Sequence, residues 1–371
     1  MLKRMIRKEL LQLRRDKKMF PILFIAPVIQ LLILGYAANF DIADIPVAVS
    51  DHDRSEESAN FLRGFFGGGY FVRALNILSD AELDPALDRG RAQLGLVIPE
   101  EFGEKLRRNE GTKVQIIVNG SDTNYGVNGY AWAVQVTARY SAAILVERMA
   151  AAGIASVPGV ELRPRVWYNP ELKTKFFMVP ALSGLILMII SIMLTAMALV
   201  REKETGTIEM LVVTPIGKLP VLAGKLLPYL VIGLVEVALV SLVAVFWFGV
   251  PFRGQVWILF LGALLFLFNT LGLGLFVSTI SRTQQRAMMI VMFVIMMPFI
   301  YLSGFVFPID SMPAMFQTIS KFIPLTYFLE IVRGLFLKGS GLANLADALI
   351  ALVVLGTITF TLSILRFRKY I

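Results

Sequence analysis

Few side chains in this sequence have the types and spacing that catalysis requires. The one histidine, His52, stands between Asp51 and Asp53, and the chain contains no cysteine. A solvated turn is favoured over a metal site there, because zinc needs three or four such ligands. Ser183 and Ser303 each precede a glycine but have no histidine partner, and we expect no lysine at membrane depth to serve as a base. The sequence thus excludes thiol chemistry and a serine–histidine hydrolase.

A phosphate-binding loop is also absent from the sequence. The pattern G-x-x-x-x-G-K-[ST] does not occur, because Gly217 and Lys218 lack both the earlier glycine and the following hydroxyl. The chain cannot hydrolyse ATP by that route, so we expect no enzyme activity and no cofactor on this chain.

Four side chains within expected membrane spans are candidates for a substrate path. A carboxylate such as Glu236 is costly in a membrane, so it either contacts a cationic substrate, relays protons, or makes an interhelical hydrogen bond, which is slightly favoured. Asn269 has the same interpretations, with packing favoured. Met292 and Met296 lie in a methionine-rich span, which suits either an adaptable lining or ordinary packing.

The composition is that of an integral membrane protein. Hydrophobic residues make up 56% of the chain and the mean hydropathy is +0.70. Six apolar segments are each about long enough to cross a bilayer: residues 20–38, 176–200, 222–250, 257–280, 288–307 and 346–365. The fold class expected is therefore an α-helical polytopic membrane protein with six transmembrane helices.

The net charge of +9 reflects membrane topology and not nucleic-acid binding. Basic residues gather in a cytoplasmic amphipathic helix at residues 1–18, in the loops at residues 201–203 and 281–286, and in the C-terminal tail. Because positive charges remain inside, both termini are expected in the cytoplasm. After transmembrane helix 1 (residues 19–40), residues 41–175 lie outside, and so does a region at residues 308–344 with two short re-entrant helices.

Residues 41–175 are expected to form an inserted extracytoplasmic α/β domain. Strands are predicted at residues 45–50, 71–77, 94–98 and 114–119, and helices at residues 55–64, 80–89 and 123–152. In the first of these helices Ser55 is the expected N-cap, and Ala59, Phe61, Leu62 and Phe65 are expected to be buried. The remainder, residues 176–371, is expected to be a five-helix transmembrane domain.

A short amphipathic helix is predicted at residues 204–214, between the second and third spans. Thr207 is a suitable N-cap, Glu209 complements the helix dipole, and Pro215 ends the helix. Ile208 and Leu211 fall on one apolar face with Val212. Such a helix on the basic side either docks on a cytoplasmic partner or lies on lipid headgroups.

These features together resemble a known family. The motifs are Glu202-Lys203-Glu204-Thr205-Gly206-Thr207-Ile208-Glu209 with Thr214-Pro215-Ile216, the loop at residues 281–288 with Gln284-Gln285, Ser303-Gly304-Phe305-Val306-Phe307-Pro308, and Pro324-Leu325-Thr326-Tyr327. In this order the chain resembles a permease subunit of ABC-2-type ABC transporters, close to the bacterial multidrug-export permeases with a large extracytoplasmic domain. The resemblance covers essentially the whole chain.

The resemblance implies an exporter of drugs or other amphipathic compounds in the bacterial inner membrane. Two copies of a separate ABC ATPase would carry the ATP and Mg, and a second permease chain would complete a homodimer or heterodimer. A periplasmic adaptor would be a further partner of the outer domain. The implied ATPase-coupling residues are Glu202, Glu204, Thr205, Gly206, Thr207, Glu209, Leu211 and Pro215, with a second cytoplasmic contact through Arg282, Gln284, Gln285 and Arg286.

The resemblance also places the substrate path between two permeases, lined by the second and fifth spans. Glu236 departs from the family pattern, so the preferred substrate charge stays open. Two other classes of function remain. A membrane scaffold or sensor would pass a ligand signal to a cytoplasmic partner. A secondary transporter is disfavoured, because it predicts internal repeats and several intramembrane charges.

Overall fold

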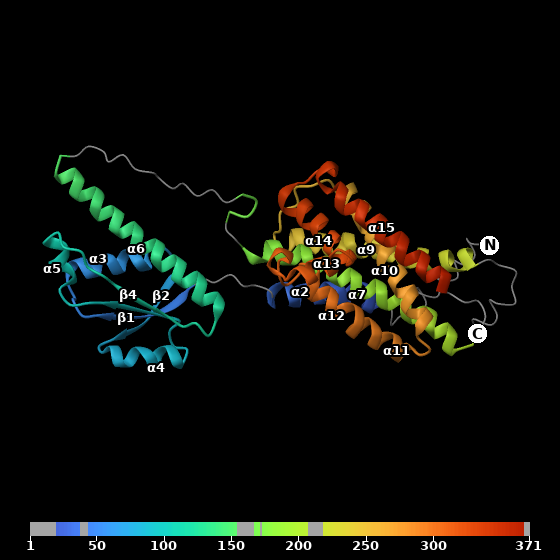
Figure 1. The fold of residues 1–371 in the computed structure, drawn as a ribbon, viewed down its shortest axis with the longest axis horizontal. Helices are drawn as coiled ribbons and strands as arrows, with labels where there is room; N and C mark the ends of the chain where they lie inside the picture. The colour runs from blue at the N-terminus through green and yellow to red at the C-terminus, as the bar shows by residue number, and fades with distance from the viewer. Residues whose placement is uncertain (1–19, 38–43, 154–166, 171–172, 207–217, 367–371) are drawn as a thin grey trace. The chain divides into compact units, whose positions relative to one another are not determined.

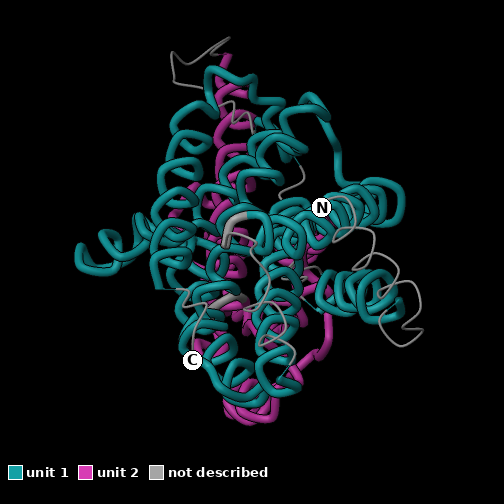
Figure 2. Tube along the Cα trace, turned by 90° about the vertical axis from the view of Figure 1, so that its right-hand side faces the viewer, with its two compact units in different colours: residues 1–39, 165–371 teal, residues 40–164 magenta. Residues whose placement is uncertain are grey.

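The computed structural model describes residues 20–37, 44–153, 167–170, 173–206 and 218–366. The chain forms two compact units (Figures 1 and 2). We call Phe40–Pro164 the α/β unit, and Met1–Asn39 together with Arg165–Ile371 the membrane unit. Because the first helix and the later helices belong to one unit, the α/β unit is an insertion within the membrane unit.

The α/β unit contains a four-stranded sheet in the order β2-β1-β3-β4. The central strand β1 pairs in parallel with β2 and β3, and β4 closes the edge antiparallel to β3. Continuous apolar runs in β1 and β3 place these strands in the buried centre. The strands are β1 (Ile45–Asp51), β2 (Phe71–Ile77), β3 (Leu94–Ile98) and β4 (Gln115–Val118), which confirms the four predicted strands.

Helices cover both faces of this sheet (Figure 1). Aromatic residues of α3, Phe61 and Phe65, form one core with Phe102 of α5 and Ala133 of α6, while Leu83 and Leu87 of α4 pack on the opposite face. The bounds are α3 (Glu56–Phe66), η2 (Asp80–Glu82), α4 (Leu83–Asp88), α5 (Phe102–Arg107) and α6 (Thr123–Ala151). The long helix α6 agrees with the prediction; the short α5 is an additional helix.

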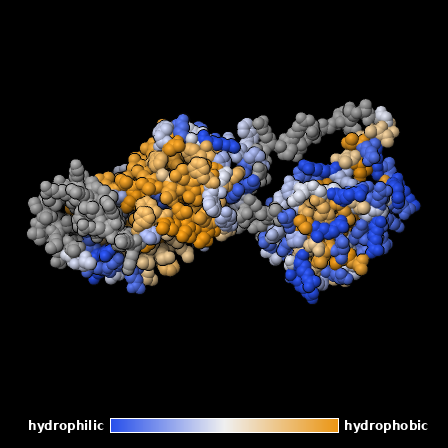
Figure 3. Space-filling view, turned by 180° about the vertical axis from the view of Figure 1, so that it is seen from behind, coloured by the Kyte–Doolittle hydropathy of each residue, from blue (hydrophilic) through white to orange (hydrophobic). Residues whose placement is uncertain are grey.

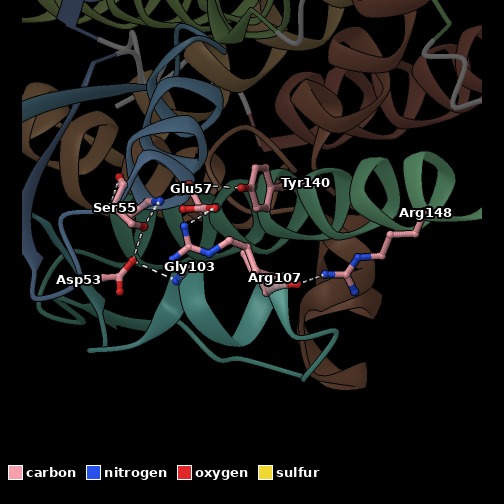
Figure 4. A network of polar contacts seen from close by, with 9 residues as sticks. Asp53, Ser55, Glu57, Gly103, Arg107, Tyr140 and Arg148 are labelled. Atoms are coloured by element: carbon pink, nitrogen blue, oxygen red, sulfur yellow. Dashed lines mark hydrogen bonds and ion pairs between the residues drawn. The ribbon is translucent and has the colours of Figure 1, made fainter. Parts of the chain in front are cut away.

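A polar network fixes the start of α3 against α5 and α6 (Figure 4). The Ser55 hydroxyl accepts from the Ser58 backbone N–H, which confirms the predicted N-cap. The predicted burial of Ala59 is wrong: Ala59 is exposed and Ser58 is buried, because the Ser58 hydroxyl donates to Asp51. Position 103 requires glycine, since a Cβ there would lie 2.5 Å from the Ser55 hydroxyl.

Five helices of the membrane unit are long and apolar enough to cross a membrane. They are α7 (Thr174–Glu204), α9 (Lys218–Phe246), α10 (Val256–Ile280), the continuous run of α11 (Gln284–Met289), η3 (Ile290–Met296) and α12 (Met297–Leu302), and α15 (Leu342–Arg366). The first apolar segment forms a shorter helix of η1 (Pro21–Ile25) and α2 (Ala26–Ala37). Its Leu23 packs with Leu199 of α7, and its Tyr36 contacts Phe248, so it lies along the bundle.

Short helices occupy the region between the fourth of these long helices and α15. They are η4 (Ile309–Ser311), α13 (Ala314–Ser320), α14 (Pro324–Arg333) and η5 (Gly334–Lys338). Helix α14 is buried on its Leu325 and Phe328 side, and Phe328 stacks on Phe266 of α10 at 4.3 Å. Neighbouring helices therefore cover this side of α14.

The face of the membrane unit seen in Figure 3 is broadly hydrophobic over the described residues. Large apolar side chains are exposed on α2, α9, η3 and α15, among them Ile33, Val231, Phe293 and Ile350. Exposed apolar area of this extent marks a surface that meets lipid or another chain.

Candidate functional site

The last turn of α7 connects four helices, and we call Glu202, Lys203 and Glu204 the α7 clamp. Glu202 forms an ion pair with Lys225 of α9, which is 4% exposed. Lys203 donates from its ammonium group to the backbone carbonyl of Ser278 in α10. The Glu204 carboxylate accepts from the Gln284 backbone N–H at 2.9 Å and from its side-chain amide. Three consecutive residues thus join α7 to α9, α10 and α11.

Two more predicted residues end α7 beside the clamp. The Thr205 hydroxyl donates to the Arg201 carbonyl at 2.9 Å. Gly206 follows with a backbone φ of +71°, in the left-handed region that glycine adopts without strain. Here the chain leaves the helix direction, as is usual for a glycine just past a helix end.

The loop at residues 281–286 lies beside the clamp. Thr283 caps α11 by accepting from the Arg286 backbone N–H at 3.2 Å, while Arg282, Gln285 and the Arg286 side chain are exposed. The structure thus brings Glu204 together with Gln284, although the sequence suggests two separate contacts. The remaining predicted coupling residues, Thr207, Glu209, Leu211 and Pro215, lie outside the described residues.

Lys225 is a clamp partner that the sequence patterns do not single out. No lysine is expected at membrane depth, yet Lys225 is buried two turns into α9. A single cation inside an apolar stretch signals a buried partner, because an unpaired buried charge is strongly unfavourable. That signal is present in the sequence, but it does not identify Glu202 as the partner.

The predicted intramembrane residues do not form one cluster of hydrogen bonds. Asn269 is fully buried and donates to the Leu352 carbonyl of α15 at 2.8 Å, which agrees with the packing interpretation. Glu236 is 2% exposed, and its Oε1 has no hydrogen-bond partner in the described part of the chain. The favoured interhelical hydrogen bond is therefore not seen for that oxygen atom.

The two predicted methionines lie on a π-helical stretch. Met292 is exposed and Met296 half-buried on η3, within the run of α11, η3 and α12. This helix has the smallest buried share of the five candidate spans. A π-helical segment widens the turn and often occurs at functional sites. Much of the surface of the run of α11, η3 and α12 is free to meet lipid or a second chain.

His52 takes part in a surface contact of the α/β unit. Its Nε2 lies 2.8 Å from Asp80 Oδ1, and Ser50 donates to the same oxygen at 2.8 Å. The hydrogen bond from His52 makes the largest contribution to lowering the pKa of Asp80 below its usual value, and the hydrogen bond from Ser50 makes the second largest. Among the described residues no group of three metal-ligating side chains occurs, and His52 acts there as a hydrogen-bonding group.

The long apolar helices and the clamp at one end of them define a multi-pass membrane protein whose helices are coupled at a polar joint. The profile of the ABC-2 family transporter proteins matches residues 17–365. The chain therefore belongs to the ABC-2 family of transporter proteins.

Its relatives are transport permeases that match over most of their length. YbhS of Escherichia coli (strain K12), a probable multidrug ABC transporter permease, is 34% identical over 336 residues, which cover 90% of this chain and 87% of YbhS. YhhJ of the same strain, an inner membrane transport permease, is 30% identical over 370 residues, covering 98% of this chain and 96% of YhhJ. The chain is accordingly a transporter permease and a multi-pass inner membrane protein.

A more distant relative matches over only part of its length. ABC transporter G family member 20 of Dictyostelium discoideum is 25% identical over 360 residues, covering 96% of this chain but 49% of that protein. The same permease sequence pattern therefore also occurs within a longer chain.

Proposed function

We propose that this chain is the permease subunit of an ATP-driven exporter that moves drugs or other amphipathic compounds out of the cytoplasm or the inner leaflet. A separate ABC ATPase, present in two copies, supplies the energy. The similarity to YbhS and YhhJ, which are transport permeases, supports a role in transport. The α7 clamp, which joins four helices, is the observation that supports coupling between the ATPase and the permease helices.

The clamp transmits motion because its contacts are short and partly buried. A displacement of the segment that follows Gly206 reaches α7 directly, and the Glu202–Lys225 pair, the Lys203–Ser278 bond and the Glu204–Gln284 bonds carry it to α9, α10 and α11. Close-packed helices shift as units and not by continuous deformation. In this proposal the part of the predicted coupling helix that follows Gly206, residues 207–214, lies against the ATPase, with Arg282, Gln285 and Arg286 as the second contact; Glu204, where the prediction began, is the last residue of α7.

The orientation follows from the charges around the clamp. Arg201, Lys203, Arg282 and Arg286 lie at the clamp end of the bundle, so this end is placed in the cytoplasm with both termini. The helix Pro21–Ala37 is then the first of six spans. The α/β unit lies outside, where it meets a periplasmic adaptor or shapes the exit.

The substrate path is placed between two permease chains. The sparsely covered helix of α11, η3 and α12 provides a surface for the second copy, and Met292 and Met296 provide an adaptable lining. Glu236 contributes a preference for cationic compounds. We expect Glu236→Gln to reduce transport of cationic compounds more than transport of neutral ones in inverted vesicles; equal effects would leave Glu236 only a packing role.

The decisive experiment is capture of the tagged full-length chain from its native membrane in mild detergent, followed by mass spectrometry. A stoichiometric partner with a phosphate loop is expected. Glu209→Arg should lose that partner, because it reverses the charge in the coupling helix. Glu110→Arg, a charge reversal at an exposed position of the α/β unit, is the matched control and should retain it.

Two outcomes would contradict the proposal. Capture of a signalling protein without an ATPase would favour the sensor class of function. Retention of the ATPase and of drug transport by Glu209→Arg would refute the coupling-helix assignment while leaving the permease family membership intact.

A further inference from the structure

Arg333 is a partly buried cation at the end of the membrane unit opposite the clamp. It lies in the last turn of α14, and its guanidinium carbon lies 3.7 Å from the ring centroid of Phe177 in α7. Phe177 precedes Arg201 by 24 residues on α7, which corresponds to about 36 Å along the helix. Since a bilayer core is about 30 Å thick, Arg333 lies at the level of the opposite headgroups.

The guanidinium of Arg333 is only partly satisfied. Its Nη1 donates to the Gly304 carbonyl at 3.0 Å, but Nε and Nη2 are buried and have no hydrogen-bond partner among the residues that the structure describes. The hydroxyl of Ser303, the residue before Gly304, is also buried without such a partner. Buried polar groups are normally hydrogen-bonded, so this concentration of unpaired donors calls for an explanation.

The two unpaired nitrogens are the pair that binds oxyanions best. On a guanidinium, Nε–H and one Nη2–H point the same way and form a fork that matches two oxygens of a phosphate or carboxylate. The third nitrogen, Nη1, is held by Gly304, which fixes the orientation of the fork. Gly304 itself has φ +82°, so its carbonyl is directed by a turn that glycine favours.

The helix dipole alone does not explain the unpaired donors of Arg333. A basic residue in the last turn of α14 does complement the negative end of the helix. The chain, however, continues into η5 from Gly334, and a dipole leaves the fork hydrogens without an acceptor. A buried charge without a partner destabilises the fold, so an anion that completes the fork is the simplest explanation.

The surroundings of the fork suit a lipid headgroup. Phe307, Met315 and Phe322 are exposed on the short segments between Gly304 and α14. Ser320 of α13 donates to the Leu302 carbonyl and so holds these segments to the end of α12. Exposed aromatic and apolar residues next to a cation are typical of the membrane interface. The Phe177 ring, which covers the guanidinium, is 39% exposed and so lies on the side from which a headgroup would reach the fork.

We propose that Arg333, with Ser303 beside it, binds the phosphate of a membrane phospholipid at the end of the bundle opposite the α7 clamp. The fork of Nε and Nη2 takes two phosphate oxygens and the acyl chains lie on the exposed apolar side chains of α12 and α13. This site is separate from the ATPase coupling and from the transported substrate.

The test uses the purified full-length chain, with any subunits that it retains, in detergent. The unfolding temperature is measured against increasing dioctanoyl-phosphatidylglycerol, dioctanoylglycerol or inorganic phosphate. A saturable rise with the phospholipid is expected, and none with dioctanoylglycerol. Arg333→Gln should weaken the apparent phospholipid affinity about tenfold or more, because a charge-assisted bidentate contact is lost.

Two variants control for loss of folding and for general charge. Arg253 is exposed and also donates to a backbone carbonyl, that of Leu337 at 3.3 Å, so Arg253→Gln is the matched control and should bind phospholipid as the parent does. Arg333→Lys keeps the charge without the fork and should retain part of the affinity.

Several results would overturn the proposal. Equal phospholipid affinity in the parent and Arg333→Gln would exclude the site, and an equal shift with dioctanoylglycerol would show apolar binding alone. Saturable stabilisation by inorganic phosphate that Arg333→Gln abolishes would identify dissolved phosphate as the ligand.

Discussion

Two cations withdrawn from solvent, Lys225 fully and Arg333 partly, lie at opposite ends of the same bundle and differ in how their charge is compensated. Lys225 is paired with the Glu202 carboxylate, whereas the Arg333 fork has no acceptor among the residues described. The chain itself completes the first contact, so that end acts as a rigid joint between helices. The second contact is left for a molecule from outside. Burial of a cation alone therefore does not reveal its role; the source of the compensating anion does.

Breaking the contact between Glu202 and Lys225 should have the largest effect. Lys225→Met leaves the partly buried Glu202 without its cation, and removing one partner of a buried pair costs about 3–5 kcal/mol. We expect the unfolding temperature of the purified chain to fall by about 5–10 °C. The double variant Glu202→Gln/Lys225→Met should recover much of this loss, as a double-mutant cycle measures.

The control for this prediction is a change of the same type away from the clamp. Lys321→Met removes an exposed lysine and should leave the unfolding temperature nearly unchanged. Additive losses in the double variant would contradict a direct Glu202–Lys225 interaction.

The two ends also differ in how well the sequence predicts them. At the clamp end, the basic residues and the Glu-Lys-Glu-Thr-Gly motif mark the site in the sequence itself, and only the partner Lys225 escapes notice. At the opposite end, Ser303 and Gly304 stand out only as part of a motif, and Arg333 does not stand out at all. Its significance depends on which of its nitrogens are bonded, a three-dimensional property that residue order does not encode.

The same distinction applies to the fold. Strands β2 and β3 begin and end at the predicted residues because apolar runs bounded by turn residues are a local signal. The predicted burial of Ala59 is wrong because helical spacing predicts a face, while the Ser58–Asp51 hydrogen bond decides which residue turns inward. The short α5 is held by Asp53 accepting from the Gly103 backbone N–H, a contact between residues that lie far apart in the sequence.

A smaller effect is expected at Gly206, where the clamp joins the coupling segment. A β-branched residue at φ +71° is strained by about 1–2 kcal/mol, whereas asparagine tolerates this conformation. Gly206→Val should therefore reduce drug-stimulated ATP hydrolysis of the reconstituted transporter, and Gly206→Asn should retain most of it. Since nothing lies within 4 Å of an added Cβ, a steric clash does not explain a loss. Equal activities of the two variants would argue against a backbone role.

A change at the exposed side of the clamp should affect coupling more than stability. Glu204→Ala removes the acceptor of both Gln284 hydrogen bonds, and we expect roughly a fivefold fall in drug-stimulated ATP hydrolysis, the size of a modest coupling between sites. Glu204→Gln keeps one oxygen for the Gln284 backbone N–H and should fall between the parent and Glu204→Ala. Unchanged stimulation in Glu204→Ala would show that α11 moves independently of α7.

The smallest effect is expected at the Arg333 fork, and it gives the sharpest comparison between the two ends of the bundle. In lipid-free detergent, Arg333→Met removes an uncompensated, partly buried charge but also loses one hydrogen bond and the stacking on Phe177. These terms oppose each other, so the free energy of unfolding should change by less than about 1 kcal/mol, far less than in Lys225→Met. Adding dioctanoyl-phosphatidylglycerol should then narrow the difference between the two variants, because it stabilises Lys225→Met and not Arg333→Met. A loss in lipid-free Arg333→Met as large as that in Lys225→Met would mean that the Arg333 fork is already paired within the chain, and the two ends of the bundle would then be alike.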